Sequence, residues 1–272
     1  MHAPSRGYTL YAMSAFDQRR APHHEVRRWL AWSAVATVVL YVIPFGRLLA
    51  WPLVLLSSFV HELGHGTVAV LVGADFQSLQ VFPDASGVAR HAGSPGRLAQ
   101  AAIAMGGLVG PSFAAAAGFL AARKSSWSRA AWSLLAFALV VLSVTVLRGF
   151  TTFAFVAMLL ALAAWIVCKA TPTQAQFATA FLATQLALSV LSRADYLFTD
   201  VAQTGSGTMP SDVAVMASSL VGPYWFWGAI CGVVSLAVTG TGLWLAGRAP
   251  RPRRPRRPRR SRGWPFQRSE SK

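Results

Sequence analysis

The sequence is poor in charge, in acids and in cysteine, and it contains no asparagine. Charged residues make up 12% of its 272 residues, whereas about 25% is usual in a soluble domain. Its two cysteines, Cys168 and Cys231, are too few for a disulfide framework or for a zinc site built from cysteine pairs. These shortages exclude an ordinary soluble domain and a disulfide-stapled secreted one.

Long apolar segments are what the sequence has instead. Apolar residues account for 54% of the chain and the mean hydropathy is +0.45. A membrane-spanning helix needs about 20 apolar residues, so the composition predicts an all-α polytopic membrane protein. The apolar runs lie at 29–45, 48–73, 98–122, 130–147, 149–168, 174–192 and 223–246.

The distribution of basic residues predicts the orientation. Both ends of the chain are basic, so the positive-inside rule places both termini in the cytoplasm and requires an even number of crossings. Arg123, Lys124 and Arg129 also belong inside. All three conditions are met if the 98–122 run, which contains Gly110-Pro111, returns to the side that it left. We therefore expect about six transmembrane helices plus a re-entrant segment.

Composition divides the chain into three parts. A polar, basic N-terminal segment covers residues 1–28, a membrane-embedded domain covers 29–247, and a tail rich in Arg and Pro covers 248–272. Regular prolines prevent helix formation, so we expect a disordered tail whose arginines attract anionic lipid headgroups. Nucleic acid is not an expected partner, because no reading module is present. The 22 arginines against 3 lysines indicate a GC-rich bacterial genome, and hence a bacterial cell membrane.

A polar stretch from Ala74 to Arg97 separates two of the apolar runs. Its residues 76–82 nearly alternate between apolar and polar, 83–87 form a turn cluster, and 88–90 fit a second short strand. This pattern predicts a β-hairpin. A second polar connection covers 193–212, and both connections are candidates for the rim of a water-accessible cavity.

The chemically informative residues are His61, Glu62 and His65, in the pattern HExxH. On a helix, positions i and i+4 differ by about 40° and about 6 Å, so both imidazoles can reach one ion. Glu62 lies about 100° round the helix, where it can touch water bound to that ion. Paired histidines can also stabilise each other in a core or hold a haem. Ionisable groups within a span cost on the order of 3 kcal/mol each, which favours a metal site, with Zn²⁺ first.

The sequence resembles the site-2 protease family of intramembrane zinc metallopeptidases. The resemblance rests on Phe59–Gly66, which contains HExxH, on the predicted hairpin with Pro83–Gly87, and on Gly106–Pro111. This order of motifs is similar to a compact, B-type-like bacterial branch and extends over about residues 48–245. It implies a zinc protease fold with His61 and His65 as metal ligands and Glu62 as the catalytic base.

The resemblance also implies a third zinc ligand, an Asp from a later helix. Between Asp84 and Arg248 the acids are Asp195, Asp200 and Asp212. Asp212 follows Pro210-Ser211, and a helix start explains it. We favour Asp195, with Asp200 as the alternative. The Asn-x-x-Pro-x-x-x-x-Asp-Gly motif that usually carries this ligand in the family is absent, since the chain has neither Asn nor Asp-Gly.

These features predict a multi-pass zinc metalloendopeptidase that hydrolyses peptide bonds of membrane-embedded protein or peptide substrates. A non-catalytic zinc-binding membrane scaffold of the same fold is the first alternative, and the missing Asn and Asp-Gly favour it. A proton- or ion-coupled transporter that uses His61, Glu62 and His65 as relays is the second. Transporters often contain internal repeats, and none is evident here.

Overall fold

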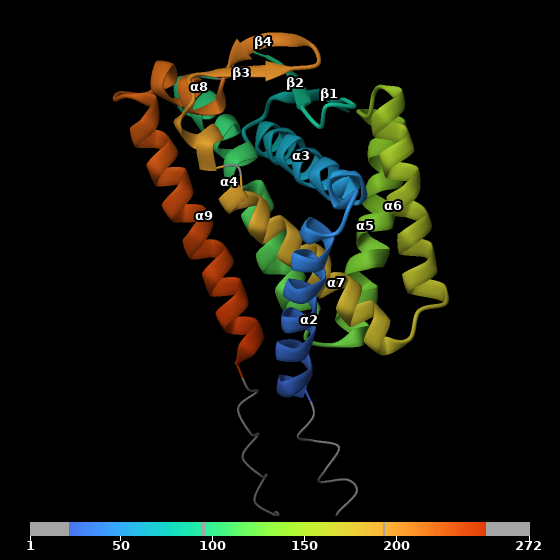
Figure 1. Cartoon of the computed structure of the whole chain (residues 1–272). Helices are drawn as coiled ribbons and strands as arrows, with labels where there is room; N and C mark the ends of the chain where they lie inside the picture. The colour runs from blue at the N-terminus through green and yellow to red at the C-terminus, as the bar shows by residue number, and fades with distance from the viewer. Residues whose placement is uncertain (1–21, 94–95, 193, 249–272) are drawn as a thin grey trace, which may run out of the picture.

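The computed structural model describes residues 22–93, 96–192 and 194–248, so most of the N-terminal segment and of the Arg/Pro-rich tail lie outside the described residues. The described chain is a helical bundle with two small hairpins at its upper end (Figure 1). Its elements are α2 (Pro22–Val42), α3 (Gly46–Leu71), β1 (Asp75–Val81), β2 (Gly87–Ala92), α4 (Arg97–Ala121), α5 (Ser125–Thr145), α6 (Phe150–Cys168), α7 (Pro172–Ser192), the short 3₁₀ helix η1 (Ala194–Phe198), β3 (Val201–Thr204), β4 (Gly207–Pro210), α8 (Asp212–Ser219) and α9 (Tyr224–Gly247).

Five helices of the described chain are long and apolar enough to cross a membrane, which confirms the expected class of all-α polytopic membrane protein. Their apolar side chains cover the outside as well as the inside, as a lipid environment allows. These helices are α3, α4, α5, α6 and α9. Helices α2 and α7 complete the bundle (Figure 1).

The expected re-entrant segment is wrong. The 98–122 run forms one continuous helix, α4, with Pro111 inside it, and α4 passes from the upper to the lower end of the bundle (Figure 1). The α2–α3 junction lies about half-way along the bundle rather than at its far end (Figure 1). Phe45, at this junction, has a positive φ of 63°, so the chain bends there. Both described ends of the chain therefore lie at the lower end of the bundle.

Helix α3 occupies the centre of the upper half, between the hairpins and the long helices α4 and α7 (Figure 1). Its buried side chains Leu55 and Phe59 belong to the main apolar core. The same core contains Leu79 of β1, Phe119 of α4 and Leu139 of α5. The helix that carries HExxH is thus held on several sides.

The predicted hairpin is present as β1 and β2, which pair antiparallel. Strand β1 is anchored on its outer edge: Leu79 N–H donates to Val146 O (2.9 Å), and Arg148 N–H donates to Leu79 O (2.9 Å). The Val81 N–H donates to Thr152 Oγ1 at 2.9 Å. Within the described chain no strand pairs with the outer edge of β2. The hairpin is therefore fixed to α5 and α6 through β1 and leaves β2 for the site.

A second antiparallel hairpin, β3–β4, covers the first. The Ser86 hydroxyl joins them, because it accepts a hydrogen bond from Gly205 N–H (2.8 Å) and donates one to Asp84 Oδ1 (2.7 Å). These contacts with Ser86 lower the pKa of the exposed Asp84 carboxyl. The ring of Phe82 lies so close to Gly205 that a Cβ there would come within 2.5 Å of it. The two polar connections predicted from the sequence thus form two hairpins that contact each other at the upper end of the bundle.

Candidate metal centre

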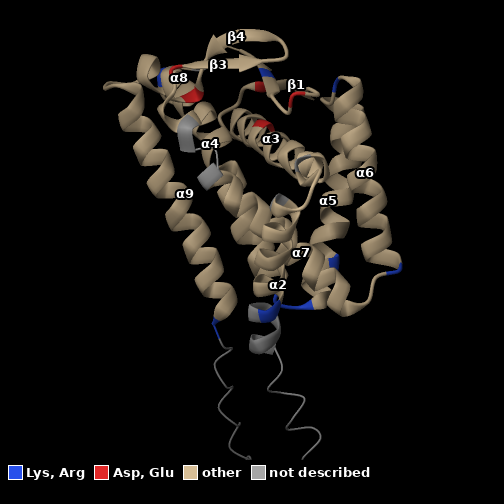
Figure 2. Ribbon diagram, in the orientation of Figure 1, with Lys and Arg blue, Asp and Glu red and all other residues tan. Residues whose placement is uncertain are grey.

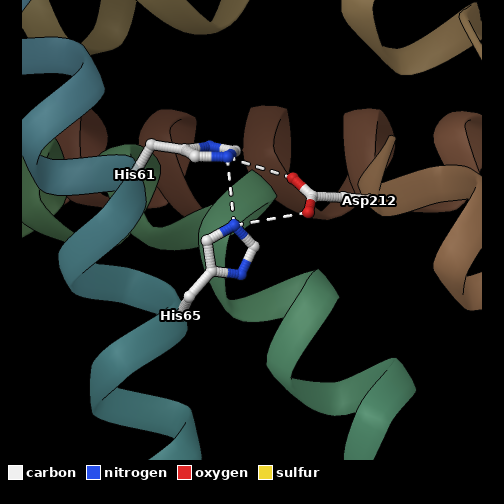
Figure 3. Close-up of side chains that lie close together, drawn as sticks. All are labelled: His61, His65 and Asp212. Carbon is white, nitrogen blue, oxygen red and sulfur yellow. Dashed lines mark hydrogen bonds and ion pairs between the residues drawn. The ribbon is translucent and has the colours of Figure 1, made fainter. Parts of the chain in front are cut away.

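Two imidazoles of α3 form the base of the site. His61 and His65 lie one helical turn apart, with 3.2 Å between their Nε2 atoms. Their ring planes are nearly perpendicular, at 86°. Both nitrogens therefore point into the same small volume (Figure 3).

Asp212 brings a carboxylate to the same volume. Its Oδ2 lies 3.0 Å from His61 Nε2 and its Oδ1 lies 3.3 Å from His65 Nε2 (Figure 3). Asp212 is the first residue of α8, and the residue before it, Ser211, is the N-cap whose Oγ accepts a hydrogen bond from Ala214 N–H at 3.2 Å. Because Ser211 caps the helix, the Asp212 carboxylate is left to face the histidines.

The structure shows where the three candidate acids, Asp195, Asp200 and Asp212, lie in the chain. Asp212 does stand at a helix start, as expected. Its carboxylate also lies against His61 and His65, which the sequence did not predict. Asp200 has an exposed side chain, and its carbonyl oxygen accepts a hydrogen bond from Ser211 N–H (2.9 Å). Asp195 belongs to η1, but its side chain lies outside the described residues, so its assignment as third ligand stays a prediction. Among the described residues, the cluster with metal-ligating geometry is His61, His65 and Asp212.

A backbone carbonyl of α4 fixes the tautomer of His65. Its Nδ1 lies 2.8 Å from the carbonyl oxygen of Ile103 on α4, and a carbonyl oxygen only accepts, so Nδ1 carries the hydrogen. The lone pair of Nε2 then points to His61 and Asp212. Such a contact is the usual way in which proteins orient a metal-binding histidine. Gly107 makes room for the ring, since a Cβ there would lie 2.2 Å from His65 Nε2.

The donor set fits a zinc ion. Two imidazole nitrogens and one carboxylate oxygen form a set that leaves a fourth position open. Asp212 Oδ2 is buried and faces His61 Nε2 at 3.0 Å, and a carboxylate in such a place needs a cation beside it. Burial acts to raise the pKa of Asp212, but the adjoining His65 and His61 outweigh it and hold that pKa below its usual range. The carboxylate is thus ionised, as a metal ligand must be.

Glu62 is buried beside this cluster, with 6% of its surface exposed. Its carboxyl interacts with the backbone N–H of Ala89 on β2. Gly87 allows the strand to come this close, because a Cβ there would lie 2.5 Å from Glu62 Cγ. The β2 backbone therefore rests directly against the carboxyl group that follows the first histidine.

Two cavities reach Glu62, with volumes of about 330 and 310 Å³. The first extends between α3, α4, α7 and α9 and contains Ser57, Pro111 and Ser235. The second lies under the hairpins and contains His65, Ala89 and Asp212. Both are lined by His61, Glu62, Gly87, Tyr196, Ala202 and Thr204. An extended chain laid across the site would place residues in both cavities.

In a comparison with known families, the chain matches the family described as Peptidase M50B-like over residues 31–242. The chain belongs to the Peptidase M50B-like family. That family corresponds to the site-2 protease-like metallopeptidases, as the motifs around His61 indicated. This family member has no significant match among curated proteins or solved structures.

Family membership and structure agree on two coarse properties. Five apolar helices in the described chain and the M50B-like match make this family member an integral membrane protein. A metallopeptidase family also implies a metal cofactor, and the His61, His65 and Asp212 cluster is a site where a metal could be held.

Proposed function

We propose that the protein is an intramembrane zinc metalloprotease that hydrolyses peptide bonds of membrane-embedded substrates. The observation that carries this proposal is the cluster of His61, His65 and Asp212 beside the buried Glu62, within a bundle of apolar helices. The family match supports peptide hydrolysis as the reaction.

In the proposed mechanism His61, His65 and Asp212 would hold the zinc ion, since Nε2 of both histidines faces the Asp212 carboxylate. When bound, the ion supplies Lewis acidity toward the peptide carbonyl and lowers the pKa of water toward about 7. The Glu62 carboxylate removes a proton from the attacking water and then delivers it to the leaving amine. The Ala89 N–H holds Glu62 in position for both transfers, and the Ile103 carbonyl keeps the His65 ring in place.

Strand β2 is the surface that the substrate chain would meet. Its neighbour β1 is occupied on the far side by residues 146–148, while Val88 and Ala89 of β2 line the second cavity. An extended substrate segment could therefore add to the β2 edge with its backbone beside Glu62. A membrane-spanning substrate must first unwind, which favours substrates with helix-breaking residues.

The decisive experiment replaces Glu62 with Gln, which keeps size and polarity but removes the proton-accepting carboxylate. We expect cleavage of a co-expressed membrane substrate to fall at least about 100-fold, with zinc content unchanged by metal analysis. Asp75→Asn, a change to an exposed acid on β1, is the matched control and should leave cleavage intact.

The same measurements separate the alternatives. Zinc binding with no cleavage by the wild type would indicate a non-catalytic metalloprotein. Cleavage that persists in Glu62→Gln would refute the assigned role of Glu62. A wild type without zinc and with ion transport in proteoliposomes would favour the relay interpretation.

A further inference from the structure

The first cavity contains two buried hydroxyl groups that the proposed hydrolysis does not use. Ser57 of α3 is 4% exposed and Ser235 of α9 is 2% exposed. Both line the cavity that opens on His61 and Glu62. Ser57 precedes His61 by one helical turn, so the two residues share a face of α3.

These hydroxyls depart from the ordinary behaviour of hydroxyls in apolar helices. Such groups usually donate to the carbonyl four residues earlier, as Thr37, Ser143 and Thr179 do here. Ser57 and Ser235 have no hydrogen bond with any residue in the described part of the chain. Neither oxygen is among the fully enclosed polar atoms without a partner in the described chain, so both hydroxyls face the cavity and can bond to whatever occupies it.

The position of the cavity identifies what would occupy it. Glu62 lines both cavities, so a chain whose scissile bond lies at Glu62 can place a neighbouring residue in the first one. The walls there combine the two serines with apolar Leu108, Pro111 and Leu197 and with further polar residues, among them Ser58, Ser189 and Gln203. A small side chain with a hydroxyl would satisfy the serines, whereas a large apolar side chain would leave them unpaired.

We propose that Ser57 and Ser235 form a specificity subsite that selects a small hydrogen-bonding residue, Ser or Thr, next to the bond that is cleaved. The inference rests on the proposed function for the identity of the substrate. It adds the chemistry of one substrate position, which the metal centre does not determine. When substrate is absent, water satisfies the same hydroxyls.

The test measures binding, so that it does not depend on turnover. The probes are synthetic membrane-spanning Leu/Ala peptides with a central Gly-X-Gly, where X is Ser, Thr, Ala or Leu. They are titrated against the full-length Glu62→Gln protein in detergent. We expect the Ser and Thr peptides to bind at least about tenfold more tightly than the Leu peptide, because Leu leaves the site's hydroxyls unpaired. The double change Ser57→Ala/Ser235→Ala should reduce this ratio to about one.

A matched control is Ser143→Ala on α5, where the hydroxyl donates to its own helix. This variant should keep the full preference, and thermal unfolding of each variant checks that it is folded. Equal binding of all four peptides, or a preference that survives the double change, would overturn the subsite. With cleavable peptides, no cleavage by the wild type despite a Ser preference in binding would refute the protease and leave the subsite intact. Equal loss of cleavage for every X in the double variant would instead indicate a water path and refute the subsite.

Discussion

Asp212 can face the two histidines because Ser211, the residue before it, caps helix α8. A short polar residue before an apolar helix usually serves as its cap, but Ser211 already does so. The Asp212 carboxylate is therefore free to lie against both histidines, with its Oδ2 3.0 Å from His61 Nε2. Burying a carboxylate costs free energy unless a cation lies beside it, so a bound metal ion would stabilise Asp212 in this position.

This arrangement predicts that Asp212, and neither Asp195 nor Asp200, supplies the third metal ligand. Asp212→Ala should weaken zinc binding at least about 100-fold, as removal of a ligand exceeds the effect of outer-shell changes. Asp200→Ala and Asp195→Ala should bind zinc as the wild type does. Competition with a chelator of known affinity measures all three. Loss of zinc in Asp195→Ala alone would restore the sequence-based assignment.

The contrast shows which part of a site local sequence can predict. His61, Glu62 and His65 lie within one helix, so their spacing alone determines their relative directions. Asp212 comes from a distant part of the chain, and tertiary structure decides which of the three acids approaches. A usable signal was present: Ser211 was already a good cap, so Asp212 was available for another role.

At the scale of elements, glycines bring α3 and α4 into direct backbone contact. A Cβ at Gly64 would lie 2.2 Å from the carbonyl oxygen of Gly106, and one at Gly110 would lie 3.3 Å from Gly64 Cα. Small residues permit this approach between membrane helices. The close packing brings the Ile103 carbonyl within reach of His65.

Gly64→Ala should therefore loosen the α3–α4 contact and destabilise the protein by about 1–3 kcal/mol, because the obstructing atoms are backbone. Gly240→Ala is the control, since Gly240 lies inside α9 and a Cβ there would meet nothing within 4 Å. That change should be neutral or slightly stabilising. Thermal unfolding in detergent compares the two. An unfolding midpoint for Gly64→Ala equal to that of Gly240→Ala would contradict the contact.

The same glycines explain why the 98–122 run was misread. Gly and Pro in a hydrophobic segment can signal a broken helix, yet here Gly106, Gly107 and Gly110 serve packing and Pro111 is accommodated within α4. The β1–β2 hairpin was predictable because its alternation and turn are local. The β3–β4 hairpin was not predicted, since its strands are four residues each and carry little periodicity.

At the scale of the whole molecule, the described acidic side chains are confined to one end. In Figure 2 Asp and Glu lie in the upper part of the bundle, whereas Lys and Arg appear at both ends and are more frequent at the lower one. The lower end includes the α4–α5 connection with Arg123 and Lys124 and the end of α9, where Arg123 Nη2 donates to Arg248 O at 3.1 Å. The positive-inside rule therefore predicts that the lower end faces the cytoplasm. The metal centre and both hairpins then lie toward the opposite side.

Two cysteines can test this orientation. Cys168 is exposed at the lower end of α6, while Cys231 is buried and should not react. In right-side-out vesicles, an impermeant maleimide should label Cys168 only after permeabilisation. In a Cys168→Ala background, Ser206→Cys in the exposed β3–β4 turn should be labelled without it. The reverse pattern would place the site on the cytoplasmic side. Labelling of both positions from one side would contradict the arrangement of the bundle, since α6 runs between the two ends.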